Sequence, residues 1–483
     1  MIFDLSAIPQ PVMQLCEILG PQKQYVVGGI LRDSIIASLD VERIHNITGA
    51  DWDLATPLPP KEVLTRLRRA GITAVPIGIE HGTIAAIIDN IQYEITTFRH
   101  DIEYSDGRHP TVRFAHSLEE DLERRDFTVN SLALDVQTGE IIDLFHGIDD
   151  IKQRIIRTVG DPEIRFNEDY LRMLRAFRFA AKMYGTIDPR TVKAIRKNAH
   201  LIQQTSAERI RDEIIKMLSY PIPSHGFILM HQSGLLRYVL PELEAGFNLG
   251  QNRFHADDVA RHILYSADAL SPRYPFLRFV TLMHDLGKVP AKQYLERKGD
   301  YVFYGHQYLS KKMTKRIMRR LRFSNKEIQT ACTIVENHMY NLKPGLSLGA
   351  TRRFLRKLGR ENVDGFLRMR MADRKGNRLN NDGYEEGLFH FMRSVRKIDL
   401  AEDALTVQKL EIGGDDLIAM HLKPGPVFSQ ILNQLLEEVI DDPLLNNHQR
   451  LLQRAGEFAA QIKETGQLIL PQRPAMDEEN NQE

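Results

Sequence analysis

The chain has 483 residues and carries 64 basic (Lys and Arg) and 64 acidic side chains, so its formal net charge is zero. This length predicts three or four domains, and the charge balance means that any nucleic-acid contact must come from local patches. Cys16 and Cys332 are the only cysteines, which excludes a disulfide framework and a cysteine zinc knuckle. No apolar run approaches ~18 residues and no leader is visible, so we expect a soluble, cytoplasmic protein without a membrane segment.

Residues 25–36 predict a strand, a turn and a helix. The apolar run 25–27 is β-prone, Gly28 and Gly29 permit a tight turn, and the following apolar residues have helical spacing. A helix that begins on glycines presents free N–H groups to a phosphate, and Arg32 adds a positive charge one turn later. A plain tight turn is the alternative.

Asp51 and Asp53 lie two residues apart on the next predicted strand, so both carboxylates point to the same face. Paired carboxylates repel each other, and Mg²⁺ ions that carry substrate phosphates relieve this repulsion. After the glycine turn, the pair indicates a nucleotidyl-transfer centre, whereas a solvated strand end is the alternative for an isolated pair.

The rest of the first 150 residues predicts a helix at 59–71 and two strands at 83–88 and 91–98. Residues 99–113 are polar and aperiodic, and we expect a mobile loop beside the active site. In the segment 124–130, two arginines beside Asp126 can hold a triphosphate and a ribose hydroxyl, or can form a surface ion pair.

A helix is predicted over residues 166–183. One apolar stripe runs along it, and Asp169, Arg172 and Arg175 fall on the opposite face. A charged face of this kind is either solvated or used to bind a substrate.

From about residue 254, histidines become frequent. His262 lies seven residues after His255, which predicts that both lie on one side of a helix. The other candidate ligands are His284 and Asp285 at the end of an apolar helix, and His306, His338 and Asp373 on separate helical segments. Nitrogen and carboxylate ligands together suit Mn²⁺, Ni²⁺ or Zn²⁺.

Two basic stripes follow, at 312–322 and 352–360. Each is either a solvated helix face or a phosphate track for RNA.

The ordered motifs resemble those of class II tRNA nucleotidyltransferases, a family of CCA-adding enzymes and bacterial poly(A) polymerases. The matching segments lie at 28–33, 51–53, 124–130, 143–150, 167–172 and 206–213. The resemblance implies that Asp51 and Asp53 are catalytic and hold two Mg²⁺ ions. It assigns phosphate, ribose and base recognition to Gly28, Gly29, Arg32, Arg125, Asp126, Asn130, Asp169, Arg172, Arg175 and Arg178.

Base selection in this family is made by the protein. The resemblance implies that Arg172 donates to cytosine acceptors and that Asp169 accepts from the exocyclic amine that C and A share.

Residues 255–380 resemble the HD phosphohydrolases. This resemblance implies that His262, His284, Asp285 and Asp373 bind a metal, and that His306 and His338 complete a second metal or phosphate site. A bound metal lowers the pKa of its water and directs it at a phosphoester.

Together these features predict an α+β protein. It has a nucleotidyltransferase head with a small mixed sheet (1–148), a helical neck (149–245), an HD domain (246–395), a helical tRNA-binding tail (396–470) and a disordered end (471–483). The predicted function is CCA addition to tRNA from CTP and ATP, with phosphohydrolase activity and no stable protein partner. The alternatives are an A-adding enzyme, a poly(A) polymerase, or an HD phosphohydrolase whose inactive head binds RNA.

Overall fold

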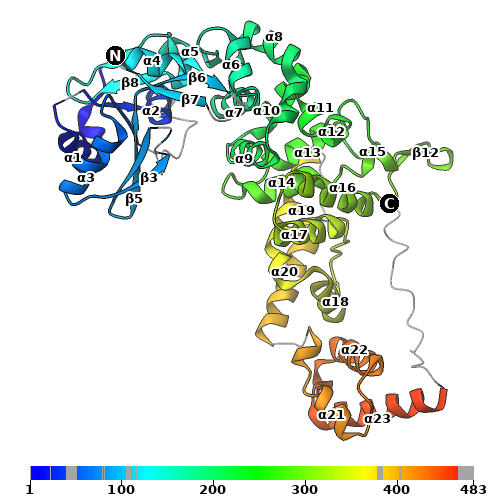
Figure 1. The fold of residues 1–483 in the computed structure, drawn as a ribbon. Coiled ribbons are helices and arrows are strands. Elements are labelled where there is room, and N and C mark those ends of the chain that lie inside the picture. Colours follow the sequence, from blue (N-terminus) through cyan, green and yellow to red (C-terminus); the bar gives the residue numbers. More distant parts are fainter. Residues whose placement is uncertain are drawn as a thin grey trace. The chain divides into compact units, whose positions relative to one another are not determined.

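The computed structural model describes the chain in two compact units, which Figure 1 shows as ribbons. The first unit is Met1–Ala245 with Ser271–Pro275, and the second is Gly246–Leu270 with Phe276–Glu483. The residues described are 2–21, 23–39, 52–78, 80, 82–104, 110–115, 117–377, 384–401 and 405–465, so the predicted disordered end lies outside them. Among these residues, no helix combines the length and the apolar character needed to cross a bilayer.

A mixed sheet forms the start of the first unit, as predicted. Within the described residues it has seven strands in the order β3-β4-β5-β2-β1-β8-β9, with β2 and β5 parallel and the other neighbours antiparallel. The strands are β1 (Tyr25–Val27), β2 (Asp53–Thr56), β3 (Thr73–Gly78), β4 (Thr83–Ile88), β5 (Ile91–Thr97), β8 (Leu132–Asp135) and β9 (Ile141–Asp143).

The interior strand β1, between β2 and β8, is buried along its whole length. Because side chains alternate along a strand, Tyr25 and Val27 share one face, where they pack against Phe98 and Leu122. The helices of this part of the chain are α1 (Gln10–Leu19), α2 (Gly29–Leu39), α3 (Pro60–Arg69), α4 (Leu118–Glu123) and α5 (Gly147–Gln153). The predicted strand, turn and helix at 25–36 are therefore present as β1 and α2.

In the segment 99–113, predicted to be a mobile loop, the described residues instead form a two-stranded sheet, and residues 105–109 lie outside the described part. Strands β6 (Arg99–Tyr104) and β7 (Pro110–Phe114) pair antiparallel, with Arg99 opposite Phe114. The prediction treated the segment as polar and aperiodic and overlooked Ile102 and Tyr104, which alternate with polar neighbours as strand residues do.

Helices make up most of the remainder of the first unit, and the predicted helix 166–183 is in fact two helices. Asp169 has extended backbone angles (φ −155°, ψ 106°) and ends the first of them. Its Oδ1 atom accepts a hydrogen bond from the Leu171 backbone N–H at 3.0 Å, so the side chain caps the start of the second helix. The helices are α6 (Pro162–Glu168), α7 (Leu171–Met183), α8 (Pro189–Asn198), α9 (Ala207–Leu218), α10 (Pro223–Ser233), α11 (Leu236–Val239) and α12 (Pro241–Glu244), with short strands β10 (Ile155–Ile156) and β11 (Thr186–Ile187).

The second unit is mainly helical. Its elements are α13 (Val259–Asp268), α14 (Pro275–Met283), α15 (Lys288–Ala291), β12 (Gln293–Leu295), β13 (Asp300–Val302), α16 (His306–Arg320), α17 (Asn325–Asn337), α18 (Leu348–Leu358), α19 (Val363–Asn377), α20 (Tyr384–Leu400), α21 (Gly414–Ala419), α22 (Pro426–Asp441) and α23 (His448–Thr465). Helices α13 and α19 pack along each other, as do α16 and α17. A side chain at Gly376 would place its Cβ 2.2 Å from Ser266 Oγ, so this glycine allows α19 to approach α13 closely.

The basic stripe at 352–360 is bound to other parts of the second unit. Arg352 donates to the Ile440 carbonyl at 3.0 Å, Arg353 pairs with Asp441, and Arg356 pairs with Glu437 at 2.5 Å. These contacts join α18 to α22, so the basic stripe is paired within the second unit at these three arginines. The stripe on α16, by contrast, is exposed at Lys312, Lys315, Arg316, Arg319 and Arg320.

Candidate functional site

The turn between β1 and α2 brings a carboxylate next to a helix N-terminus. Gly28 has φ 88°, a conformation that favours glycine, and a Cβ on it would lie 3.1 Å from Asp53 Oδ2. The register of the sheet places Asp53 opposite Val27, directly before this turn. Asp51, the other predicted catalytic carboxylate, lies outside the described residues.

Arg32 is buried on the first turns of α2 and folds back over its start. A Cβ on Gly29 would lie 3.1 Å from Arg32 Nη2. The guanidinium donates to the side-chain oxygen of Asn130 and, through Nε at 2.9 Å, to Asp33. The phosphate-binding candidates on α2 are therefore connected to the segment around Asn130.

Asp126 is the centre of this polar network. Its Oδ1 accepts from the Asn130 side-chain amide at 3.0 Å, and its Oδ2 accepts from Arg175 Nε at 2.7 Å. Burial alone would raise the pKa of Asp126, but the charge of Arg175 and the hydrogen bond from Asn130 outweigh burial and lower the pKa to about 2. Asp126 is therefore ionised at neutral pH, and its ion pair with Arg175 joins α7 to the segment 124–130.

Phe179 on α7 organises the arginines that face the head. The guanidinium carbons of Arg178, Arg32 and Arg175 lie 4.1, 4.8 and 5.4 Å from the centre of its ring. Arg178 also pairs with Glu213 at 2.5 Å. Phe179 was not among the predicted site residues, although its position four residues after Arg175 indicates that the two side chains share one side of the helix.

Lys182, one turn further along α7, was also missed. Its Nζ lies 2.6 Å from Asp33 Oδ2. Burial and the nearby charge of Arg32 lower the pKa of Lys182 to about 8, although Asp33 opposes this shift. The spacing of Arg175, Arg178 and Lys182 along the helix is the pattern that indicates one basic face.

The remaining predicted nucleotide-binding side chains have other partners. Arg125 pairs with Asp121 at 3.0 Å. Asp169 pairs with Arg209 at 2.7 Å, and Arg172 pairs with Glu168. The structure thus joins Arg32, Arg125, Asp126, Asn130, Arg175 and Arg178 to one network, while Asp169 and Arg172 lie at the junction of α6 and α7.

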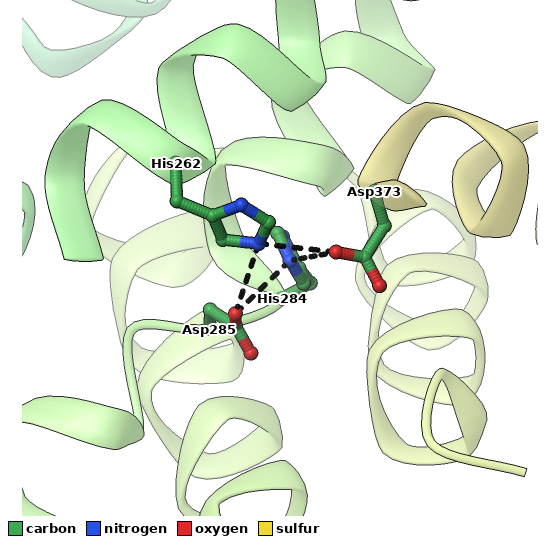
Figure 2. Close-up of side chains that lie close together, drawn as sticks. All are labelled: His262, His284, Asp285 and Asp373. Atoms are coloured by element: carbon green, nitrogen blue, oxygen red, sulfur yellow. Dashed lines mark ion pairs between the residues drawn. The ribbon is translucent and has the colours of Figure 1, made fainter. Parts of the chain in front are cut away.

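Four side chains of the second unit converge in a buried centre, which Figure 2 shows. His262 on α13 and His284 after α14 direct their Nε2 atoms at two carboxylates. His262 Nε2 lies 3.3 Å from Asp285 Oδ2 and 3.0 Å from Asp373 Oδ1, and His284 Nε2 lies 3.3 and 3.4 Å from the same two atoms. One ligand atom of each residue lies within 4.8 Å of the others, which suits a single metal ion.

Asp285 also belongs to a second cluster. Its other oxygen, Oδ1, lies 3.2 Å from His306 Nε2 and 3.4 Å from His338 Nε2. The Asp285 carboxylate therefore lies between the two clusters, an arrangement that allows it to bridge two metal ions. All six predicted ligands are brought together in this way.

The hydrogen bonds around the histidines favour metal binding over a simple ion-pair network. The Nδ1 atoms of His284, His306 and His338 lie 2.7 to 2.9 Å from backbone carbonyl oxygens, which assigns their N–H to this side and leaves each Nε2 with a lone pair. His306 Nε2 and His338 Nε2 then face each other at 3.2 Å, and two lone pairs at this distance require a cation or a proton between them. The residues therefore fit a divalent metal.

Buried atoms without hydrogen-bond partners also favour metal binding. Among the described residues, the Nε2 atoms of His262 and His284 and the Oδ1 atom of Asp285 have none. Burial disfavours the charged imidazolium of His284, but Asp285 and Asp373 outweigh it and raise the pKa of His284 to about 10. Without a metal, the proton that this pKa implies lies on His284 Nε2 between the two carboxylates, and a bound metal would take its place on the lone pair.

Glycine at position 287 allows the turn after Asp285 to reach α16. A Cβ there would lie 2.2 Å from the His306 carbonyl oxygen and 2.5 Å from the Ser310 backbone nitrogen. The Gly287 N–H donates to Ser310 Oγ at 2.9 Å. This close packing positions Asp285 between the two clusters.

Lys288 is a further residue of the centre that was not among the predicted ligands. Its Nζ lies 2.7 Å from Asp285 Oδ2, 2.8 Å from Gln251 Oε1 and 3.1 Å from His255 Nε2. His255 contributes here from an irregular segment before α13, so the prediction that it shares a helix with His262 is wrong. The helix begins only at Val259, because Asp258 caps its start.

Three family models match parts of the chain. The model of the poly A polymerase head domain matches residues 24–157, that of the RNA and SrmB-binding site of polymerase A matches 186–247, and that of tRNA nucleotidyltransferase domain 2 matches 302–455. Two curated relatives are CCA-adding enzymes. The protein of Anoxybacillus flavithermus is 44% identical over 220 residues, which are 45% of this chain and 52% of that protein. The protein of Levilactobacillus brevis is 42% identical over 230 residues, which are 47% of this chain and 54% of that protein.

The chain thus spans about half the length of the curated relatives it matches. A solved structure of the Bacillus stearothermophilus CCA-adding enzyme with CTP is 26% identical and has a TM-score of 0.70, and the match covers 95% of this chain and 100% of that one. The predicted α+β fold is confirmed by this likeness.

Proposed function

We propose that this chain, which belongs to the tRNA nucleotidyltransferase and poly(A) polymerase family, adds CCA to the 3′ end of tRNA from CTP and ATP. The observation that carries this proposal is the glycine turn, where Asp53 lies against the start of α2 within the segment that matches the head domain. The two curated relatives named above, both CCA-adding enzymes, support it.

The residues at this turn fit a metal-bound triphosphate. Gly28 leaves open the space beside Asp53 that a side chain would fill, and we expect Asp51 and Asp53 to hold two Mg²⁺ ions there. Bound Mg²⁺ supplies activation of the tRNA 3′-hydroxyl and neutralises charge on the leaving pyrophosphate. The N–H groups at the start of α2 and the Arg32 guanidinium bind the triphosphate.

The polar network behind the turn fixes the phosphate and ribose ligands before substrate arrives. Arg32 is oriented by Asn130, Asn130 by Asp126, and Asp126 by Arg175. Because these bonds already exist, little reorganisation is needed when the nucleotide binds. Arg125, Asp126 and Asn130 then recognise phosphate and ribose.

Base selection is assigned to Asp169 and Arg172. Asp169 accepts from the amine of C or A, and Arg172 donates to acceptors on the base. Asp169 pairs with Arg209, and Arg172 pairs with Glu168. A charged partner therefore orients each of the two side chains. Two fixed side chains that read a feature shared by C and A account for selection of both nucleotides.

The test uses tRNA transcripts that end before CCA, after C and after CC, each incubated with Mg²⁺ and with CTP, ATP or both. Two C additions followed by one A support CCA addition. Growth of the CC-ended transcript alone, by one A, would identify an A-adding enzyme, and long A tails on any RNA a poly(A) polymerase.

We also propose that the second unit is an HD-type metal-dependent phosphohydrolase. The two histidine and aspartate clusters that share Asp285 carry this second proposal. The four ligands around Asp373 and the pair His306 and His338 would hold Mn²⁺, Ni²⁺ or Zn²⁺. A metal-bound water of lowered pKa suits hydrolysis of phosphoesters such as 2′,3′-cyclic phosphates on RNA ends.

Paired variants separate the two activities. Asp53→Ala should abolish nucleotide addition and leave hydrolysis of bis(p-nitrophenyl) phosphate with Mn²⁺ unchanged, and Asp285→Ala should do the reverse. If Asp53→Ala leaves all activity on tRNA unchanged, the head only binds RNA, and the protein is a phosphohydrolase alone.

A further inference from the structure

The β12–β13 hairpin is inserted in the chain between residues of the histidine and aspartate centre. Lys288, which contacts Asp285, begins α15, and α15 leads directly into β12. β13 leads through Phe303 to His306, and the Phe303 carbonyl oxygen lies 2.9 Å from His306 Nδ1. Both ends of the hairpin are therefore fixed at the centre, and Figure 1 shows the hairpin extending away from α15.

Aromatic side chains are exposed on this hairpin and beside it. Tyr294 is 58% exposed, and its ring lies 5.3 Å from that of Tyr301, its partner across the two strands. Tyr304 and Tyr308, which follow β13, are exposed as well, and so is Phe254 on the segment that supplies His255. Large exposed rings next to a buried polar centre indicate a binding surface.

Cations accompany these rings. Lys292 Nζ lies 3.9 Å from the centre of the Tyr301 ring, and the guanidinium carbon of Arg253 lies 5.2 Å from that of Phe254. The segment 292–304 and Arg253 together hold four basic residues against two acidic ones. The surface therefore combines π faces with a positive charge excess, which are the properties that single-stranded nucleic acid requires.

The hairpin is connected to the loop that completes the centre. Lys292 Nζ lies 2.6 Å from the Gly250 carbonyl oxygen, and the Arg253 backbone N–H donates to Asp300 Oδ2 at 3.2 Å. The same loop supplies Gln251 and His255, which contact Lys288. A ligand that binds the hairpin is thus held at the rim of the centre.

We infer that the β12–β13 hairpin is a stacking platform for the last unpaired bases of an RNA 3′ end, whose terminal phosphate it presents to the histidine and aspartate centre. The inference rests on the proposed phosphohydrolase function of that centre. Stacking does not select among bases, because every base has a π face. The substrate class is therefore a single-stranded RNA end of any sequence that carries a terminal phosphate.

The first experiment compares two substrates on the full-length protein loaded with Mn²⁺. One is a six-nucleotide RNA with a 2′,3′-cyclic phosphate, and the other is bis(p-nitrophenyl) phosphate, which has no base to stack. In the double variant Tyr294→Ala and Tyr301→Ala, we expect KM for the RNA to rise about tenfold. kcat on the RNA and both constants for the small diester should remain unchanged.

Two controls accompany the double variant. Tyr294→Phe keeps the ring and should behave as the unchanged protein does. Phe389→Ala removes a ring of similar exposure, 59%, from α20 and should not raise KM. An unchanged KM in the double variant, or an equal rise in Phe389→Ala, would overturn the inference.

The second experiment does not depend on hydrolysis. The same RNA with 4-thiouridine at its last two positions is irradiated with the full-length protein, and the crosslinked peptides are identified. Crosslinks within residues 292–304 that disappear in the double variant support the platform, even if the phosphohydrolase proposal fails. Crosslinks confined to other segments would refute the platform, even if the protein hydrolyses the small diester.

Discussion

Replacement of Gly28 by alanine tests whether the glycine turn positions Asp53 for nucleotidyl transfer. Gly28 has φ 88°, and a residue with a Cβ in the left-handed region costs about 1–2 kcal/mol. The new Cβ would also lie 3.1 Å from Asp53 Oδ2, a distance at which the carboxylate must shift by a few tenths of an ångström. The substitution therefore combines backbone strain with a displaced carboxylate.

Gly71→Ala is the matched control. Gly71 has φ 76°, but a Cβ there would meet nothing within 4 Å. Both variants should lose about 1–2 kcal/mol in the free energy of unfolding, measured with urea. Only Gly28→Ala should lose nucleotide addition, by about 100-fold in kcat/KM for CTP on a tRNA that lacks CCA, because small misplacements of catalytic groups cost this much.

Two results would refute this reasoning. If both variants lose activity equally, the loss follows from stability alone. If Gly28→Ala unfolds as expected but keeps full activity, the position of Asp53 at the turn is not required for transfer. Hydrolysis of bis(p-nitrophenyl) phosphate by the second unit should be unchanged in both variants, which shows that the protein has been prepared intact.

Three further predictions follow from other contacts. Gly287→Ala places a Cβ 2.2 Å from a carbonyl oxygen of α16 and should lower the amount of bound Mn²⁺, measured by mass spectrometry, at least tenfold. Gly250→Ala, whose Cβ would meet nothing within 4 Å, should bind metal normally. Equal loss of metal in the two variants would contradict the packing argument. Arg209→Ala releases the carboxylate of Asp169 and should reduce the preference for CTP and ATP over UTP and GTP about tenfold, and an unchanged preference would argue against it. Asp126→Asn should destabilise the protein by about 2 kcal/mol at pH 7, because the pKa of this carboxyl is about 2 in the folded state and 3.8 in the unfolded state. In urea unfolding at successive pH values, the stability difference between the two proteins should shrink as the pH falls through 3.8 towards 2. A stability difference that does not depend on pH would contradict this cause.

Features that depend on neighbouring residues in the sequence were predicted well. Strand β1, the glycine turn and helix α2 follow from local apolar spacing and from the freedom of glycine, and the structure contains all three. Asp89 and Asn90 separate the two predicted strands 83–88 and 91–98, and their φ angles of 51° and 62° are those of a two-residue hairpin turn.

Features that depend on distant partners were missed or placed incorrectly. Periodicity indicates a continuous helix over 166–183, but the side chain of Asp169 competes for a backbone N–H and divides it. The charges of Arg352 indicate a solvated stripe, but this side chain contacts a carbonyl 88 residues away. Lys288 gives no signal beyond its spacing from Asp285, because its other partners come from the loop before α13.

The chemistry of the two proposed activities sets their order on one RNA end. Nucleotide addition requires a free 3′-hydroxyl as nucleophile, and an end that carries a 2′,3′-cyclic phosphate has none. Hydrolysis in the second unit must therefore break the bond between phosphorus and O3′, which leaves the phosphate on O2′ and frees the 3′-hydroxyl, before addition in the head can begin. The ligand sets differ as well, since Asp51 and Asp53 offer only oxygen atoms, whereas the second centre offers imidazole nitrogens. Nitrogen ligands favour transition metals, and oxygen ligands favour Mg²⁺. A chelator selective for transition metals should therefore stop the protein from extending tRNA that ends in a 2′,3′-cyclic phosphate. The protein should still extend tRNA with a free 3′-hydroxyl.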